Sequence, residues 1–233
     1  MTEGTCGHGC SHGLSEKSCI SRVPIFNHLD EDKMKEISSL IESLSYHKGE
    51  LVYQAGEPSD ALYIISQGKM KIYRLSEQGK EQLLRMLYPG DFTGELALFS
   101  EKVHDSYGEA LEDTRICSIR REDLQKLLLK YPTISMEILS EFSKRLDAQE
   151  RQTATIATEK VETRIALYLI DLMDEEKENP FTLPMMKKDL ASLLGTTPET
   201  ISRKFLEFEE RGLMLSLPQN RIRIIDREGL KKL

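Results

Sequence analysis

The sequence predicts an α+β protein in which an N-terminal antiparallel β-roll, a long helix and a C-terminal winged helix-turn-helix follow one another. Three observations lead to this prediction. Short apolar or alternating runs separated by glycines extend from Gly49 to about Ile119, a helical pattern continues from Thr133 beyond Thr158, and two amphipathic helices joined by a tight turn precede a small hairpin. We expect a Cys/His-rich segment over residues 1–21, the roll over 22–132, the long helix over 133–160 and the winged helix-turn-helix over 161–233.

Composition and charge narrow the class of protein. The chain has 233 residues, 39% of them hydrophobic and 30% charged, as in soluble globular proteins with two small domains. Apolar runs stay well short of the about 18 residues that a membrane span needs, and the polar N-terminus does not look like a signal segment. We therefore expect a cytoplasmic protein with no membrane partner. The net charge is −7, but residues 184–233 carry +3 and the remainder −10, so the C-terminal end is suited to contacting phosphates.

The N-terminal segment contains three of the four cysteines, Cys6, Cys10 and Cys19, and the fourth, Cys117, lies far along the chain. In a cytosolic chain this distribution indicates a metal, cluster or redox site more than a structural disulfide framework. Glycines between these residues leave the backbone able to wrap around an ion. Two histidines, His8 and His12, are interspersed, so a Cys/His zinc site is one alternative.

The predicted roll is preceded by a short helical pattern from Asp32 to Leu44. Six strands then follow at regular spacing with glycine-bearing turns, which is typical of an antiparallel barrel or roll able to enclose a ligand. We expect these strands at Glu50–Tyr53, Ala61–Ser66, Lys69–Leu75, Gln82–Leu87, Glu109–Leu111 and Arg115–Ile119.

The long helix has a row of side chains that step by three and four residues, as in a coiled-coil seam with a polar middle. One alternative is a helix packed along its own domain, but a helix this long between two domains is more easily buried against a second copy. We therefore expect a homodimer, held weakly because Gln149 and Thr153 are polar. The predicted dimerisation residues are Leu139, Phe142, Leu146, Gln149, Thr153 and Ile156.

The stretch from Gly195 to Gly212 predicts a helix with clear ends: Thr197 as N-cap, Pro198 in the first turn and Gly212 after the last. Together with the amphipathic helix Met185–Leu194 it predicts a helix-turn-helix, although an ordinary surface helix has a similar local pattern. Its apolar face is formed by Ile201, Phe205 and Phe208, and Glu199, Ser202 and Arg203 share another face.

Side-chain chemistry assigns roles on that second face. Arg203 can donate two hydrogen bonds to guanine, and Glu199 can accept one from cytosine N4. The hairpin of Met214–Leu217 and Arg221–Ile225 reads as a wing that contacts phosphates. The complete predicted DNA-contacting set is Glu199, Ser202, Arg203, Thr197, Thr200, Lys204, Arg221 and Arg223.

From Pro24 onward the chain resembles the Crp–Fnr family of bacterial transcription regulators. The resemblance is carried by Gly68, Tyr88-Pro-Gly-Asp-Phe92, Gly94-Glu-Leu-Ala-Leu-Phe99 and Pro198-Glu-Thr-Ile-Ser-Arg203. It implies a homodimer that binds double-stranded DNA and works with RNA polymerase. In members that bind cyclic nucleotides an Arg-Ser pair holds the phosphate, whereas Asp105-Ser106 stands here, and an acidic residue repels a phosphate. We therefore do not expect cyclic AMP as a ligand, and expect Glu95 to be structural.

Within that family, Glu-Thr-Ile-Ser-Arg and the cysteines resemble the oxygen-responsive, fumarate-and-nitrate-reduction branch. That resemblance implies anaerobic regulation, Ser202 on a neighbouring thymine, a TTGAT-like palindrome and a 4Fe–4S cluster on Cys6, Cys10, Cys19 and Cys117. The Cys-x3-Cys-x8-Cys spacing is wider than in well-known members. Zinc at the same cysteines, with or without His8 and His12, and a reversible disulfide from Cys117 to an N-terminal cysteine are the alternatives.

The sequence does not predict an enzyme. A cupin-type metalloenzyme is a remote alternative, but His28, His47 and His104 have neither a His-x-His pair nor facial-triad spacing within the strands. We also find no nucleophile elbow, phosphate loop or paired acid motif.

Overall fold

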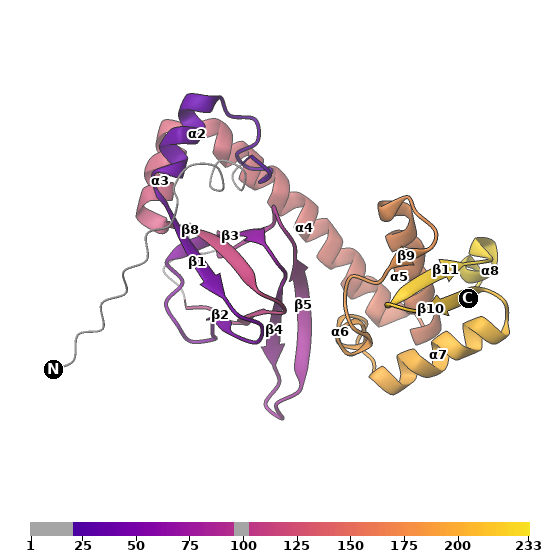
Figure 1. The fold of residues 1–233 in the computed structure, drawn as a ribbon. Coiled ribbons are helices and arrows are strands. Elements are labelled where there is room, and N and C mark those ends of the chain that lie inside the picture. The colour runs from indigo at the N-terminus through magenta and orange to yellow at the C-terminus, as the bar shows by residue number, and fades with distance from the viewer. Residues whose placement is uncertain (1–20, 96–102) are drawn as a thin grey trace. The chain divides into compact units, whose positions relative to one another are not determined.

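The computed structural model describes residues 21–95 and 103–233, which form two compact units (Figure 1). Of these residues, the first unit contains 21–72, 86–95 and 103–142, and the second contains 73–85 and 143–233. In the described part of the chain, no helix is long and apolar enough to cross a membrane.

The strands of the roll form two four-stranded sheets, ordered β1-β8-β3-β6 and β2-β7-β4-β5. The pairings β1–β8, β8–β3, β3–β6 and β2–β7 are antiparallel, which confirms the predicted roll. The strands are β1 Ile41–Tyr46, β2 Leu51–Tyr53, β3 Ala61–Gln67, β4 Met70–Leu75, β5 Glu81–Leu87, β6 Phe92–Thr93, β7 Tyr107–Ala110 and β8 Thr114–Arg120.

The structure corrects the helix expected from Asp32 to Leu44. Helix α2 spans only Glu31–Ser38, and the next residues form β1. The side chain of Asp30 caps α2 by accepting a hydrogen bond from the Lys33 N–H. Strand β1 pairs with β8, from Ile41 opposite Ile119 to Tyr46 opposite Thr114. Because that partner lies far along the chain, the local pattern of residues 41–44 did not reveal the strand.

One hydrophobic cluster joins the roll to the helices of the first unit. In Figure 1, α2 lies beside α3 (Arg121–Lys130) and the start of α4 (Pro132–Thr158). The cluster combines residues before α2, strands β3, β6 and β8, and three helices. Its buried members are Val23, Ile25, Phe26, Ile37, Leu62, Ile64, Phe92, Cys117, Ile119, Leu124, Leu127, Ile134 and Ile138.

Helix α4 uses different faces along its length. Near its start, Ile134 and Ile138 are buried in this cluster and Phe142 packs against it. Leu139 and Leu146 are 56% and 57% exposed, and Ile156 is 37% exposed. The start of α4 therefore packs on its own roll, while the seam predicted for a second copy keeps exposed apolar side chains.

The second unit contains the predicted winged helix-turn-helix, here with one more strand and one more helix than the sequence indicated. A three-stranded sheet, ordered β10-β11-β9, accompanies the helices. Strand β9 pairs with β11 through Phe181 opposite Ile222. The elements are α5 Val161–Glu176, β9 Phe181–Thr182, α6 Lys187–Leu193, α7 Pro198–Glu210, β10 Met214–Leu217, β11 Arg221–Ile224 and α8 Arg227–Lys231.

Candidate nucleic-acid interface and cysteine site

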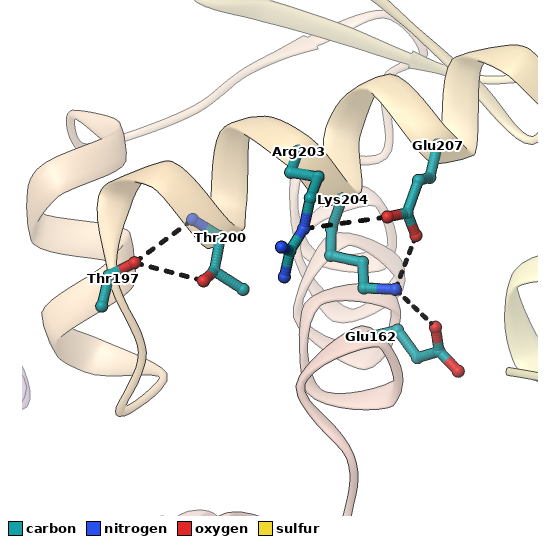
Figure 2. Close-up of polar contacts among 6 residues, drawn as sticks. All are labelled: Glu162, Thr197, Thr200, Arg203, Lys204 and Glu207. Carbon is teal, nitrogen blue, oxygen red and sulfur yellow. Dashed lines mark hydrogen bonds and ion pairs between the residues drawn. The ribbon is translucent and has the colours of Figure 1, made fainter.

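Helix α7 is the candidate reading helix, and its N-terminus is capped as predicted. The Thr197 hydroxyl accepts a hydrogen bond from the Thr200 N–H at 3.3 Å and lies 3.1 Å from the Thr200 hydroxyl (Figure 2). The helix is anchored by Ile201, Phe205 and Phe208, all of them buried. Thr197 and Thr200 therefore shape the start of the helix in addition to any contact they make with DNA.

The turn before α7 is held by a residue that the sequence did not single out. Arg164 of α5 is 9% exposed, and its Nη1 donates to the Leu194 carbonyl at 2.6 Å. Gly195 follows in the left-handed region with φ +63°, and a Cβ there would lie 3.3 Å from the same nitrogen. The left-handed φ favours glycine, and any Cβ would also push the Arg164 guanidinium aside by a few tenths of an ångström, so Arg164 and Gly195 together set the geometry of the turn. The sequence signal that could have identified Arg164 is a single arginine among the apolar residues of α5.

The predicted reading residues share an exposed face of α7. Glu199, Ser202 and Arg203 are all exposed, and the Arg203 side chain keeps 68% of its surface accessible. Hydrogen bonds from the backbone N–H of Glu199 and from the Thr197 side chain lower the pKa of Glu199, so its carboxylate stays an ionised acceptor. This face can thus offer a guanidinium donor, a hydroxyl and a carboxylate to base edges.

Lys204 has a different environment from Arg203 although it is adjacent in sequence. Its Nζ lies 2.9 Å from Glu162 Oε2 on α5 and 2.5 Å from Glu207 Oε2 on α7 (Figure 2). Its side chain is only 19% exposed. Hydrogen bonds to Glu207 and then Glu162 raise the pKa of Lys204. The ammonium therefore joins α7 to α5, and this geometry favours a structural role over the predicted DNA contact.

The wing presents the two predicted arginines on one face of β11. Arg221 and Arg223 are both exposed and alternate along the strand. The hairpin turn holds Gln219 and Asn220 at φ 62° and 60°, and the Asn220 amide donates to the Leu183 and Met185 carbonyls. The wing is thereby fastened to the chain leading into α6, and its exposed Arg221 and Arg223 side chains are able to contact phosphates.

Cys117 lies in the middle of β8, between Ser43 of β1 and Ile64 of β3. It is 2% exposed and belongs to the same cluster as Val23, Ile25 and Phe26. The other predicted ligands, Cys6, Cys10, Cys19, His8 and His12, lie outside the described residues. Among residues 21–95 and 103–233, no three His, Cys, Asp or Glu side chains converge to hold a metal ion. A metal or cluster site at Cys117 would therefore have to draw its other ligands from the N-terminal segment.

The resemblance puts a cyclic-nucleotide phosphate at the positions of Asp105 and Ser106, both of which the structure describes. Asp105 is exposed and Ser106 is 8% exposed. A buried cation of the roll, Lys71, is paired with Glu109 at 3.1 Å. Nearby, His104 stacks on Tyr53 with ring centroids 3.9 Å apart, and burial lowers the pKa of His104.

Comparisons with known proteins cover almost the whole chain. Two family models match it, the cyclic nucleotide-binding domain over residues 43–131 and the Crp-like helix-turn-helix domain over residues 163–233. A Lacticaseibacillus casei protein named "Probable transcriptional regulator flp" is 33% identical over 214 residues, which cover 92% of this chain and 97% of that protein.

One further sequence relative and one solved structure also match most of the chain. The fumarate and nitrate reduction regulatory protein of Vibrio cholerae is 29% identical over 231 residues, which cover 97% of this chain and 91% of that protein. The solved structure of FixK2 from Bradyrhizobium japonicum superimposes with a TM-score of 0.72 at 26% identity, over 83% of this chain and 96% of that chain.

Proposed function

We propose that this chain, which belongs to the Crp–Fnr family of transcription regulators, reads a palindromic DNA site as a homodimer under the control of its four cysteines. The chain is a DNA-binding regulator and not an enzyme. The observation that carries the reading proposal is the exposed row of Glu199, Ser202 and Arg203 on a capped, anchored α7. We propose that α7 enters the major groove, where Arg203 contacts guanine and Glu199 contacts cytosine, in a TTGAT-like half-site.

The dimer proposal rests on the exposed part of the α4 seam. Leu139, Leu146 and Ile156 are apolar side chains at helical spacing with more than a third of their surface accessible. A second α4 helix would remove this surface from water, and two α7 helices would then read half-sites one turn of DNA apart. Phe142 contributes less to such a seam, because it packs against the core of its own unit.

The cysteine proposal rests on the position of Cys117 within the first unit. Cys19 precedes Val23 by only four residues, a length of chain that spans at most about 14 Å when it is fully extended. Val23 packs in the cluster that contains Cys117. We propose that Cys6, Cys10, Cys19 and Cys117 hold a 4Fe–4S cluster, which when bound supplies an oxygen-sensitive link between the N-terminal segment and the roll.

The same hydrophobic cluster could couple the state of the cysteine site to the long helix α4. It contains Cys117 of β8 and also Ile134 and Ile138, the buried residues at the start of α4. A change in the packing around Cys117 therefore bears directly on the helix that we propose as the dimer seam. Loss of the link would then shift the dimer equilibrium and release DNA.

Anaerobic purification tests the cofactor. A brown protein with iron and labile sulfide, and a Cys117→Ala variant that folds but lacks both, would support the cluster. A colourless protein with stoichiometric zinc would instead favour the Cys/His zinc site. A metal-free protein whose mass falls by about two hydrogens in air would favour the disulfide.

DNA selection tests the reading proposal independently of the cofactor. Duplexes enriched by the wild-type protein should be palindromic, and Arg203→Ala should weaken binding by about 1–3 kcal/mol and relax preference at one base pair per half-site. Equal weakening on all duplexes would contradict the assignment of Arg203 as a base-reading residue.

A further inference from the structure

Glu207 lies one turn beyond the exposed reading row, between two cations of different burial. Its Oε1 is 3.9 Å from Arg203 Nε and its Oε2 is 2.5 Å from Lys204 Nζ (Figure 2). Helical spacing explains both contacts, because residues at i, i+3 and i, i+4 are neighbours on a helix surface. One carboxylate therefore bridges the proposed guanine-reading side chain and the inward-facing lysine.

The inner half of this bridge is fixed from another helix. Lys204 Nζ is also 2.9 Å from Glu162 Oε2 on α5, and the Lys204 and Glu162 side chains are 19% and 27% exposed. An arginine followed four residues later by an acid is the weaker order for a pair on an isolated helix. Here the tie to Lys204 and Glu162 holds the carboxylate in place, so Glu207 restrains Arg203 more than the 3.9 Å distance alone would suggest.

The way in which Glu207 contacts Arg203 is compatible with base reading. The contact is made at Nε, and in Figure 2 the terminal nitrogens of Arg203 point away from Glu207. Those two nitrogens can donate to guanine O6 and N7. A negative charge beside the guanidinium also disfavours approach by a phosphate, which carries no sequence information.

We propose that Glu207 is a positioning residue for Arg203, which orients the guanidinium toward guanine and increases discrimination at that base pair. This inference rests on the proposed DNA-reading function. It assigns a specificity role to a side chain outside the row of Glu199, Ser202 and Arg203.

The test compares variants on two duplexes: the palindrome selected by the wild-type protein, and the same palindrome changed at the base pair where Arg203→Ala loses its preference. The ratio of the two dissociation constants measures discrimination. Because ordering one long side chain costs about two- to tenfold in affinity, Glu207→Gln should reduce this ratio by about two- to tenfold. Glu210→Gln is the matched control, since Glu210 is exposed on the same helix and the same charge is removed.

A double-mutant cycle separates positioning from a structural effect. In an Arg203→Ala background, Glu207→Gln should have no further effect on the ratio, because the side chain that it orients is absent. A Glu207→Gln ratio equal to that of wild type or of Glu210→Gln would overturn the inference, as would an effect that persists without Arg203.

The results distinguish a wrong role for Glu207 from a wrong assignment of the DNA-reading function. If the wild type selects no site, or Arg203→Ala keeps every preference, the proposed reading function is wrong. If both behave as proposed and only Glu207→Gln is neutral, the role of Glu207 alone is wrong.

Discussion

Replacing Lys204 by methionine distinguishes a helix-packing role from DNA contact. Methionine keeps an apolar stem and removes the ammonium that bridges Glu162 and Glu207, at 2.9 and 2.5 Å. Their side chains are 27% and 39% exposed, so solvent screens the carboxylates only in part. Without Lys204 these two negative charges face each other across the α5–α7 contact.

The size of the effect follows from this intermediate burial. Exposed ion pairs contribute about 0.2–1 kcal/mol, and breaking a buried pair costs about 3–5 kcal/mol. Two partly exposed pairs to one ammonium should therefore give a loss of about 1–2 kcal/mol in the free energy of unfolding. For a unit of roughly 100 residues, each kcal/mol lowers the melting temperature by about 4–8 °C.

Two measurements check this prediction. Urea unfolding should show the loss of stability, while the slope of log affinity for DNA against log salt concentration should stay at the wild-type value. The control is Arg221→Met on the exposed wing, which should lower the slope by about 0.9 per phosphate contact with little change in stability. If Lys204→Met instead lowers the slope and leaves stability unchanged, Lys204 is a phosphate contact and the structural role argued for it is wrong.

Three other predictions concern different parts of the chain. Leu146→Glu places a charge on the proposed dimer seam, so light scattering should find monomers, and the affinity for DNA should fall. A persistent dimer would place the interface elsewhere. Phe208→Ala should cost about 3–5 kcal/mol, because the ring is fully buried, and calorimetry should show an early transition. Burial lowers the pKa of His104, so the contribution of His104 to stability is present above about pH 6.5 and is lost as the pH falls below that value. His104→Phe should therefore make the free energy of unfolding in urea less dependent on pH between about pH 5 and 8. A pH dependence equal to that of wild type would contradict this prediction.

Much of the second unit could be predicted because its signals are local. Thr197 caps α7 through Thr200, three residues away, and the buried face of Ile201, Phe205 and Phe208 repeats with the helical period. The expectation for residues 32–44 failed for the opposite reason. There the strand β1 depends on pairing with β8, and an apolar pattern of that length is compatible with either a helix or a strand.

Residue types, spacing and family resemblance were enough to predict the roll, the long helix, the helix-turn-helix and the exposed row of Glu199, Ser202 and Arg203. Only the folded structure shows that Arg203 and its neighbour Lys204 have different environments, because Lys204 pairs with Glu162, which lies 42 residues earlier in the chain. The same is true of Arg164, which reaches the carbonyl of Leu194 across 30 residues. It also holds for Cys117, which shares one hydrophobic core with Val23 and Ile134. Such contacts depend on how distant segments pack, and no local spacing encodes them.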